Sequence, residues 1–112
     1  MSVQEFDVSA ALALLSGGEE AVCLKIASPE IEVNVWLLPD EAAELSTLPS
    51  RSQASKSLRL GLSAGGGVHW SRDAHGLYHL LVGEDDETWD IGLTVDSVTF
   101  SAILNAVTHP IR

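Results

Sequence analysis

VHWSRDAHGLYHLLVGEDDETWDIGLTV, residues 68–95, is the stretch of sequence that decides the fold. Apolar residues recur at every second position in three runs, residues 68–71, 77–82 and 89–95, and turn-forming residues separate the runs. A period of two places successive side chains on opposite faces of a strand, so each run has one apolar face. The stretch therefore predicts three antiparallel strands joined by short turns.

The same alternation predicts three further strands upstream, at residues 21–27, 31–37 and 58–62. Serine, proline and glutamate at positions 28–30 form a turn signal between the first two runs, which predicts a hairpin. In the third run we expect the leucines at positions 58, 60 and 62 to share the core face, because alternate residues of a strand point the same way.

Three segments have helical patterns. Residues 7–16 are rich in alanine and leucine and are followed by two glycines, which predicts an N-terminal helix ended by glycine. Pro39 and the acidic residues after it predict a short helix over residues 39–45. After the last strand, Asp96 or Ser97 is expected to cap a final helix that ends before Pro110.

Together these elements predict a single α+β domain over residues 1–112. Its antiparallel β-sheet has about six strands in a meander, with N- and C-terminal helices packed on one face. A chain of 112 residues that is 46% hydrophobic is long enough and apolar enough to bury one core without disulfides or metal.

The charge of the chain restricts its partners. Sixteen acidic residues against six lysines and arginines give a formal charge of -10. Such a charge repels phosphate backbones, so nucleic-acid binding is disfavoured and basic proteins become the favoured partners.

Targeting signals are absent from the pattern. Cys23 is the only cysteine, so no internal disulfide can form and nothing indicates an oxidising compartment. No apolar run approaches the roughly 20 residues of a membrane-spanning helix, and the acidic start of the chain lacks the basic and apolar regions of a signal peptide. We therefore expect a cytoplasmic protein that contacts no membrane, and no motif indicates a cofactor.

The sheet face opposite the core holds the candidate site. Requiring the apolar residues to share one face predicts that His69 lies opposite His79, with Gly61 opposite His69 and Gly92 opposite His79. Three apolar side chains, those of Trp36, Leu77 and Leu81, fall on the same face, and we expect something to cover it.

Two kinds of chemistry are open to the histidine pair. Cross-strand neighbours have Cβ atoms about 5 Å apart, so His69 and His79 could share a metal ion, with Asp90 as a third ligand. The same imidazoles could act as a general acid and base near neutral pH. The plainer interpretation, two exposed strand histidines, is favoured, because the pattern places no nucleophile or oxyanion donor and identifies no catalytic residue.

The sequence favours a small acidic protein-interaction domain without catalytic activity, of the adaptor, chaperone or immunity-like kind. Its partner would be a basic protein or a second copy of the chain in a homodimer. The expected contact residues on the outer face are Trp36, Leu77, Leu81, His69 and His79. The alternative is an enzyme that binds a small ligand or metal through His69 and His79.

Overall fold

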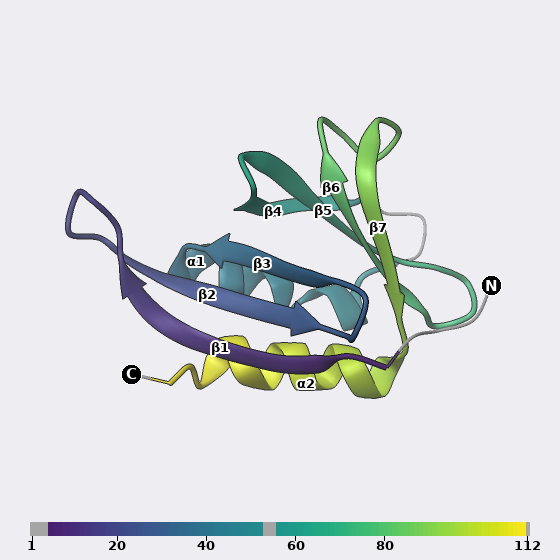
Figure 1. The fold of residues 1–112 in the computed structure, drawn as a ribbon. Helices are drawn as coiled ribbons and strands as arrows, with labels where there is room; N and C mark the ends of the chain where they lie inside the picture. Colours follow the sequence, from purple (N-terminus) through teal and green to yellow (C-terminus); the bar gives the residue numbers. More distant parts are fainter. Residues whose placement is uncertain (1–4, 53–55, 112) are drawn as a thin grey trace.

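The computed structural model describes residues 5–52 and 56–111. Within these ranges the chain forms one seven-stranded antiparallel sheet and two α-helices, which confirms the α+β class and the meander (Figure 1). Each strand pairs with the next one along the chain. The strands are β1 (Asp7–Leu14), β2 (Glu20–Ala27), β3 (Glu32–Leu37), β4 (Leu58–Ser63), β5 (Gly66–Arg72), β6 (Tyr78–Gly83) and β7 (Trp89–Val95). The helices are α1 (Pro39–Leu45) and α2 (Ser97–Thr108), with a short 3-10 helix, η1 (Leu48–Ser50), after α1.

The predicted N-terminal helix is wrong, because residues 7–14 form strand β1. This strand pairs with β2 along its whole length, from Asp7 opposite Ala27 to Leu14 opposite Glu20. The segment also alternates, with Val8, Ala10 and Leu12 turned toward the core and more exposed residues between them. Pairing with β2 overrides the helix propensity of alanine and leucine. The two glycines close a hairpin turn instead of ending a helix.

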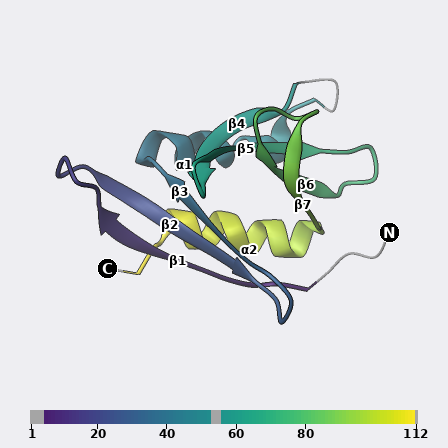
Figure 2. The ribbon, with the colours of Figure 1, turned by 45° about the horizontal axis from the view of Figure 1, so that its top comes forward.

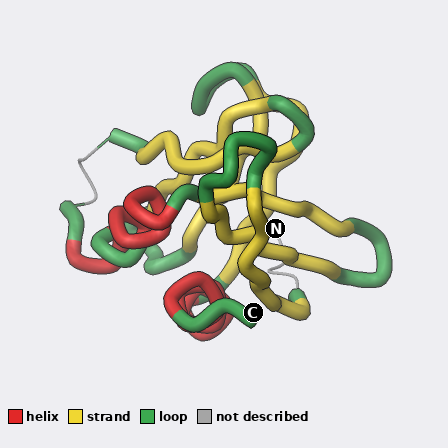
Figure 3. The backbone as a smooth tube through the Cα atoms, turned by 90° about the vertical axis from the view of Figure 1, so that its left-hand side faces the viewer, coloured by secondary structure: helices red, strands yellow, loops and turns green. Residues whose placement is uncertain are grey.

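The sheet consists of two halves that diverge. Strands β1–β3 form one half and β4–β7 the other, and a single cross-strand pair, Trp36 opposite Leu62, joins β3 to β4 (Figures 1 and 2). Helix α2 packs along β1, α1 packs against β4, and both helices contact β2 and each other (Figure 3). None of the described helices is long and apolar enough to cross a membrane.

One core connects the two halves and the helices. Trp70 of β5 and Phe100 of α2 are each 1% exposed, and their rings meet edge to face with centroids 6.3 Å apart. Tyr78 of β6 stacks on the other side of Phe100, with ring centroids 3.9 Å apart. The backbone N–H of Thr99 donates to the carboxylate of Asp96 at 2.8 Å, so Asp96 is the N-cap that the sequence predicted for this helix. Aromatic packing against α2 thus fixes β5 and β6 to the helical layer.

A β-bulge at Gly61 changes which leucines of β4 reach the core. Arg59 lies opposite His69 and Leu62 opposite Gly67, so β4 has one more residue than β5 between these pairs. Gly61 has a φ of +87°, a conformation that glycine adopts without a Cβ penalty. The extra residue turns Leu62 outward, where it is 49% exposed. The prediction that all three leucines share the core face is therefore wrong for Leu62.

Hydrogen bonds from both layers hold the bulge in place. The indole Nε1 of Trp70 donates to the carbonyl oxygen of Leu60 at 2.9 Å. The backbone N–H of Gly61 donates to the carboxylate of Glu41 on α1 at 3.0 Å. A Cβ at Gly61 would lie 2.8 Å from side-chain atoms of Leu37 and Val35 and 2.9 Å from the carbonyl oxygen of Trp36. The close approach of β3 to β4 therefore requires glycine at this position.

We predict that Gly61→Ala lowers the free energy of unfolding by about 3 kcal/mol, because it combines left-handed strain with overpacking against backbone. The matched control is Gly65→Ala in the β4–β5 turn, where φ is +83° but no atom lies within 4 Å of the new Cβ. This control is expected to lose only about 1 kcal/mol through strain alone. Urea unfolding of both variants measures the difference, and equal losses would contradict the close-packing argument.

Candidate functional site

The outer face, defined as the sheet face whose side chains point away from the buried core, has a different register from the predicted one. His69 lies opposite Leu81, and His79 lies opposite Ser71 and Thr94. The predicted pairs His69–His79, Gly61–His69 and His79–Gly92 are therefore wrong. The two histidines remain on one face, but in successive rows.

The lengths and positions of the turns explain the errors. The predicted pair of His69 with His79 centres the β5–β6 turn on Ala74, whereas Arg72 pairs with Tyr78 and centres it on His75. The predicted pair of Gly61 with His69 leaves five residues between Leu62 and Val68, but Ser63 pairs with Gly66 and leaves only Ala64 and Gly65 between them. Both have positive φ, as a two-residue type I′ hairpin turn requires. The predicted pair of His79 with Gly92 implies a two-residue β6–β7 connection, but the connection spans five residues, 84–88. A change of turn length shifts every pair along the strands.

His79 is held between a carboxylate and a hydroxyl. Its Nε2 lies 2.8 Å from Oδ2 of Asp73, and its Nδ1 lies 3.0 Å from Oγ1 of Thr94. The other oxygen of Asp73 accepts the backbone N–H groups of His75 and Leu77, at 2.8 and 3.1 Å. The hydrogen bond with His79, followed by these backbone bonds, lowers the pKa of Asp73 below its usual value. Both ring nitrogens of His79 thus have partners, and the side chain fastens the β5–β6 turn to β7.

His69 lies beneath the acidic β6–β7 loop. Its Nε2 is 3.1 Å from the carbonyl oxygen of Gly83, and the residue is only 4% exposed. Within the loop, the carboxylate of Asp86 accepts a 2.8 Å hydrogen bond from the hydroxyl of Ser57, the residue before β4. A loop that begins at β6 and reaches Ser57 must pass over the outer side of β5. The protein therefore covers part of its own outer face, which accounts for the burial of His69.

The proposed metal ligands do not form a cluster. Asp90 lies at an irregularity in β7, between Ile91 opposite Val82 and Trp89 opposite Gly83. In the described part of the chain, no three His, Cys, Asp or Glu side chains are placed to hold one ion. His79 would have to give up Asp73 or Thr94 to bind a ligand, and His69 is buried.

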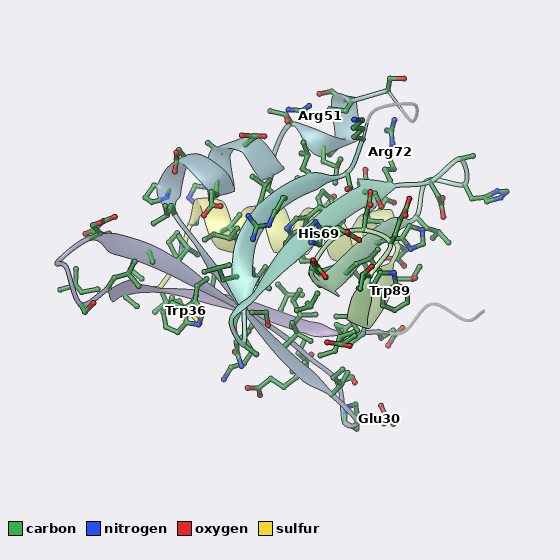
Figure 4. All side chains as sticks on the ribbon, turned by 90° about the horizontal axis from the view of Figure 1, so that it is seen from above. Glu30, Trp36, Arg51, His69, Arg72 and Trp89 are labelled. Carbon is green, nitrogen blue, oxygen red and sulfur yellow. The ribbon has the colours of Figure 1, made fainter. Side chains whose placement is uncertain are left out.

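A row of paired residues crosses the outer face from edge to edge. Each member lies opposite the next on the neighbouring strand, in the order Ala11, Cys23, Trp36, Leu62, Gly67, Gly83 and Trp89. Trp36 and Leu62, at the junction of the two halves, are 42% and 49% exposed. Figure 4 shows Trp36 on the β1–β3 half and Trp89 on the other half, near His69. The large apolar side chains of this row thus stand on either side of two glycines.

Beside Trp36 and Leu62 lies a half-open groove with a volume of about 520 Å³. We call it the junction groove, because it lies where β3 leads into α1, between the β1–β2 turn and β4. Its lining is mainly apolar and comprises Leu15, Ala21, Trp36, Leu37, Leu38, Gly61 and Leu62, with Glu19, Glu41 and Arg59 as its charged members. Such a groove can take up apolar side chains and leave charged groups at its rim.

The charged groups of the junction groove have unequal roles. The carboxylate of Glu41 accepts the backbone N–H groups of Leu38 at 2.9 Å and Gly61 at 3.0 Å, so both oxygens already have partners. The side chain of Arg59 lies over Gly67, where a Cβ would collide with its guanidinium. Arg59 and Glu19 are the charged side chains of the groove that remain available to an occupant.

The sequence located only part of this surface. Trp36 lines the junction groove, whereas His69, His79 and Leu81 lie on the outer face of β5 and β6, and Leu77 lies just before β6. Leu81 and the indole of Trp89 both approach Gly92, where a Cβ would meet them at 3.1 and 2.8 Å. Leu62 was missed because it was assigned to the core. The glycine before it was the available signal, since a glycine inside a strand often marks a bulge.

Cys23, next to Trp36 in the row, is not an activated thiol. Burial is the largest influence on its pKa and raises it, and nearby Lys25 opposes this only in part. A raised pKa keeps the thiol protonated at neutral pH, so Cys23 contributes a small apolar surface beside Trp36.

No protein-family model, curated protein or solved structure matches this chain. Its function is therefore inferred from its own surface.

We predict that Asp73→Asn destabilises the protein near pH 5 and that the deficit shrinks as the pH falls toward about 3. A carboxylate with a lowered folded-state pKa stabilises the protein above its unfolded pKa of about 3.9, and this contribution is lost as the pH falls through the folded value. Urea unfolding across this range measures the deficit. Asp90→Asn is the control, since the Asp90 side chain forms no hydrogen bond or salt bridge with a described residue, and the substitution is expected to change stability little across this range. A deficit for Asp73→Asn that is the same at pH 5 and pH 3 would contradict the prediction.

Proposed function

We propose that this protein is a non-catalytic domain that binds a protein partner through the junction groove. The observation that carries the proposal is the exposure of Trp36 and Leu62, which lie side by side and line a half-open, mainly apolar groove. Tryptophan is among the residues most enriched at binding hot spots, and clustered exposed apolar side chains typically mark interaction surfaces.

The construction of the groove favours binding without large rearrangement. Trp36 and Leu62 stand on paired strands, and the glycine bulge between β3 and β4 is held by Glu41 and Trp70. Side chains presented by a rigid sheet lose little conformational entropy when a partner covers them. Apolar side chains of the partner would enter the groove, while its polar groups meet Arg59 and Glu19 at the rim.

The net charge of -10 favours a basic partner, because complementary charge speeds association. The combination of an acidic surface and an apolar anchor fits an adaptor, a chaperone or a protein that neutralises a basic toxin. We also propose a cytoplasmic location, because the single cysteine cannot form an internal disulfide. A second copy of the chain could occupy the groove in a homodimer, which sedimentation at high concentration distinguishes from binding of another protein.

The alternative, an enzyme that uses His69 and His79, has less support. Both nitrogens of His79 have partners in Asp73 and Thr94, and His69 is 4% exposed. The junction groove contains neither histidine.

The proposal predicts that a displayed library of random peptides panned against the protein yields sequences with neighbouring large apolar residues. Leu62→Glu or Trp36→Ala is expected to weaken their binding at least tenfold, because loss of a hot-spot contact costs about 2 kcal/mol or more. Fluorescence polarisation with the selected peptides measures the affinity.

The matched control is Val98→Glu, which also replaces an exposed apolar residue by an acid but lies on α2, outside the groove lining. It is expected to bind the peptides as the unmodified protein does. Peptides whose binding is unaffected by Leu62→Glu, or a library that yields no groove-dependent binder together with a monomer in sedimentation, would refute the proposal.

A further inference from the structure

The two edges of the sheet differ in whether they are covered. At β1, Ile111 near the C-terminus forms a parallel bridge with Ala11. The N–H of Leu12 donates to the carbonyl of Ile111 at 2.8 Å, and the N–H of Ile111 donates to the carbonyl of Ala10 at 2.9 Å. Ile111 thus pairs with some of the backbone hydrogen-bonding groups at the open side of edge strand β1.

At the other edge, β7 pairs with β6 alone (Figure 1). Among residues 5–52 and 56–111, no segment forms backbone hydrogen bonds with its outer side. Residues 89–92 are all exposed, including Trp89 at 46% and Ile91 at 36%. In an antiparallel strand every second residue directs its N–H and C=O groups away from its neighbour, so β7 offers an open row of donors and acceptors.

The charged residues in the segment that forms this edge are all acidic. Residues 84–96 contain six acidic residues and no lysine, arginine or histidine. The acids are Glu84, Asp85, Asp86, Glu87, Asp90 and Asp96. A strand that binds here therefore passes from the acidic β6–β7 loop, along Asp90, to the start of α2.

This charge decides between two occupants of the edge. Pairing of β7 with β7 of a second copy would bring two acidic segments together, and like charges opposite one another destabilise a sheet. The carboxylate of Asp90 on the edge strand disfavours a second copy further, since charges on edge strands hinder self-pairing. An extended basic segment gains from the same charges that repel a second copy.

We propose that the free edge of β7 binds an extended, basic segment of a protein partner by strand addition. Backbone hydrogen bonds to β7 hold the segment, and lysine or arginine side chains meet Asp90 and the acidic loop. Trp89 and Ile91 lie on opposite faces of the sheet, because Asp90 is the extra residue between their pairs with Gly83 and Val82. The two side chains therefore contact neighbouring apolar residues of the added strand, which point to its two faces. This site is separate from the junction groove and does not depend on it.

The test uses the 112-residue chain and a nine-residue synthetic peptide in which pairs of lysines alternate with pairs of valines, so that each face of the added strand carries both residue types. Fluorescence polarisation measures its affinity, and hydrogen exchange locates the amides that it protects. We expect binding with protection confined to β7 and the adjoining loop. A peptide with N-methyl groups at alternate backbone nitrogens retains the charge and the side chains but loses the hydrogen bonds, so we expect it to bind at least tenfold more weakly.

Two charge-reversal variants test the contribution of the acidic residues. Asp90→Lys is expected to weaken peptide binding at least tenfold, whereas Glu20→Lys, the same change in charge at the start of β2, is expected to change it less than threefold. The proposal is overturned if the N-methylated peptide binds as well as the parent, if glutamate in place of lysine leaves affinity unchanged, if protection falls outside β7, or if no binding occurs at low salt. Because Leu62→Glu is expected to leave this binding intact, failure here and failure of the junction groove are distinguishable.

Discussion

The bulge at Gly61 is the constraint on which the rest of the structure depends. A residue without a Cβ lets β4 approach the side chains of Val35 and Leu37 closely enough to join the two halves of the sheet. The carboxylate of Glu41 and the indole of Trp70 fix the backbone on either side, so α1 and the core both define its position. A buried donor or acceptor left without its partner costs about 1 to 3 kcal/mol. Any arrangement of β4 that breaks these two hydrogen bonds is therefore less stable than the observed one.

The same bulge creates the candidate site. One extra residue in β4 reverses the direction of Leu62, which therefore stands beside Trp36 on the outer face and not in the core. Since this is the one cross-strand pair between β3 and β4, the strands diverge on both sides of it. The junction groove occupies part of that opening. The bulge thus moves Leu62 from a core position to an exposed one, at the junction where β3 and β4 diverge.

The acidic residues of the β6–β7 loop and of β7 have two different roles. The acidic β6–β7 loop folds back to Ser57 and buries His69, so part of the outer face is occupied by the chain itself. Asp90 and the remaining acids border the free edge of β7, where they oppose self-pairing and favour a basic strand. The apolar junction groove and the free backbone edge of β7 are therefore two separate surfaces, and we propose that they bind partners of different chemistry. His79, one of the two histidines that the sequence singled out, ties Asp73 to Thr94 across the turn.

Sequence alone predicted six strands, within residues 21–37 and 58–95, the helix at residues 39–45 and a final helix capped by Asp96 or Ser97, because their periods and caps are local properties. It failed at residues 7–14, which satisfy both a helical propensity and a period of two, so that only a partner strand selects between them. It failed again at the registers, which differ from the predicted ones by two positions because the turns differ in length or centre. It also failed at Leu62, which a bulge shifts by one position without changing the apolar pattern of the strand. Which side chains meet on the outer face was decided by tertiary structure: the relative positions of paired strands depend on contacts between residues far apart in the chain, and no local pattern encodes those.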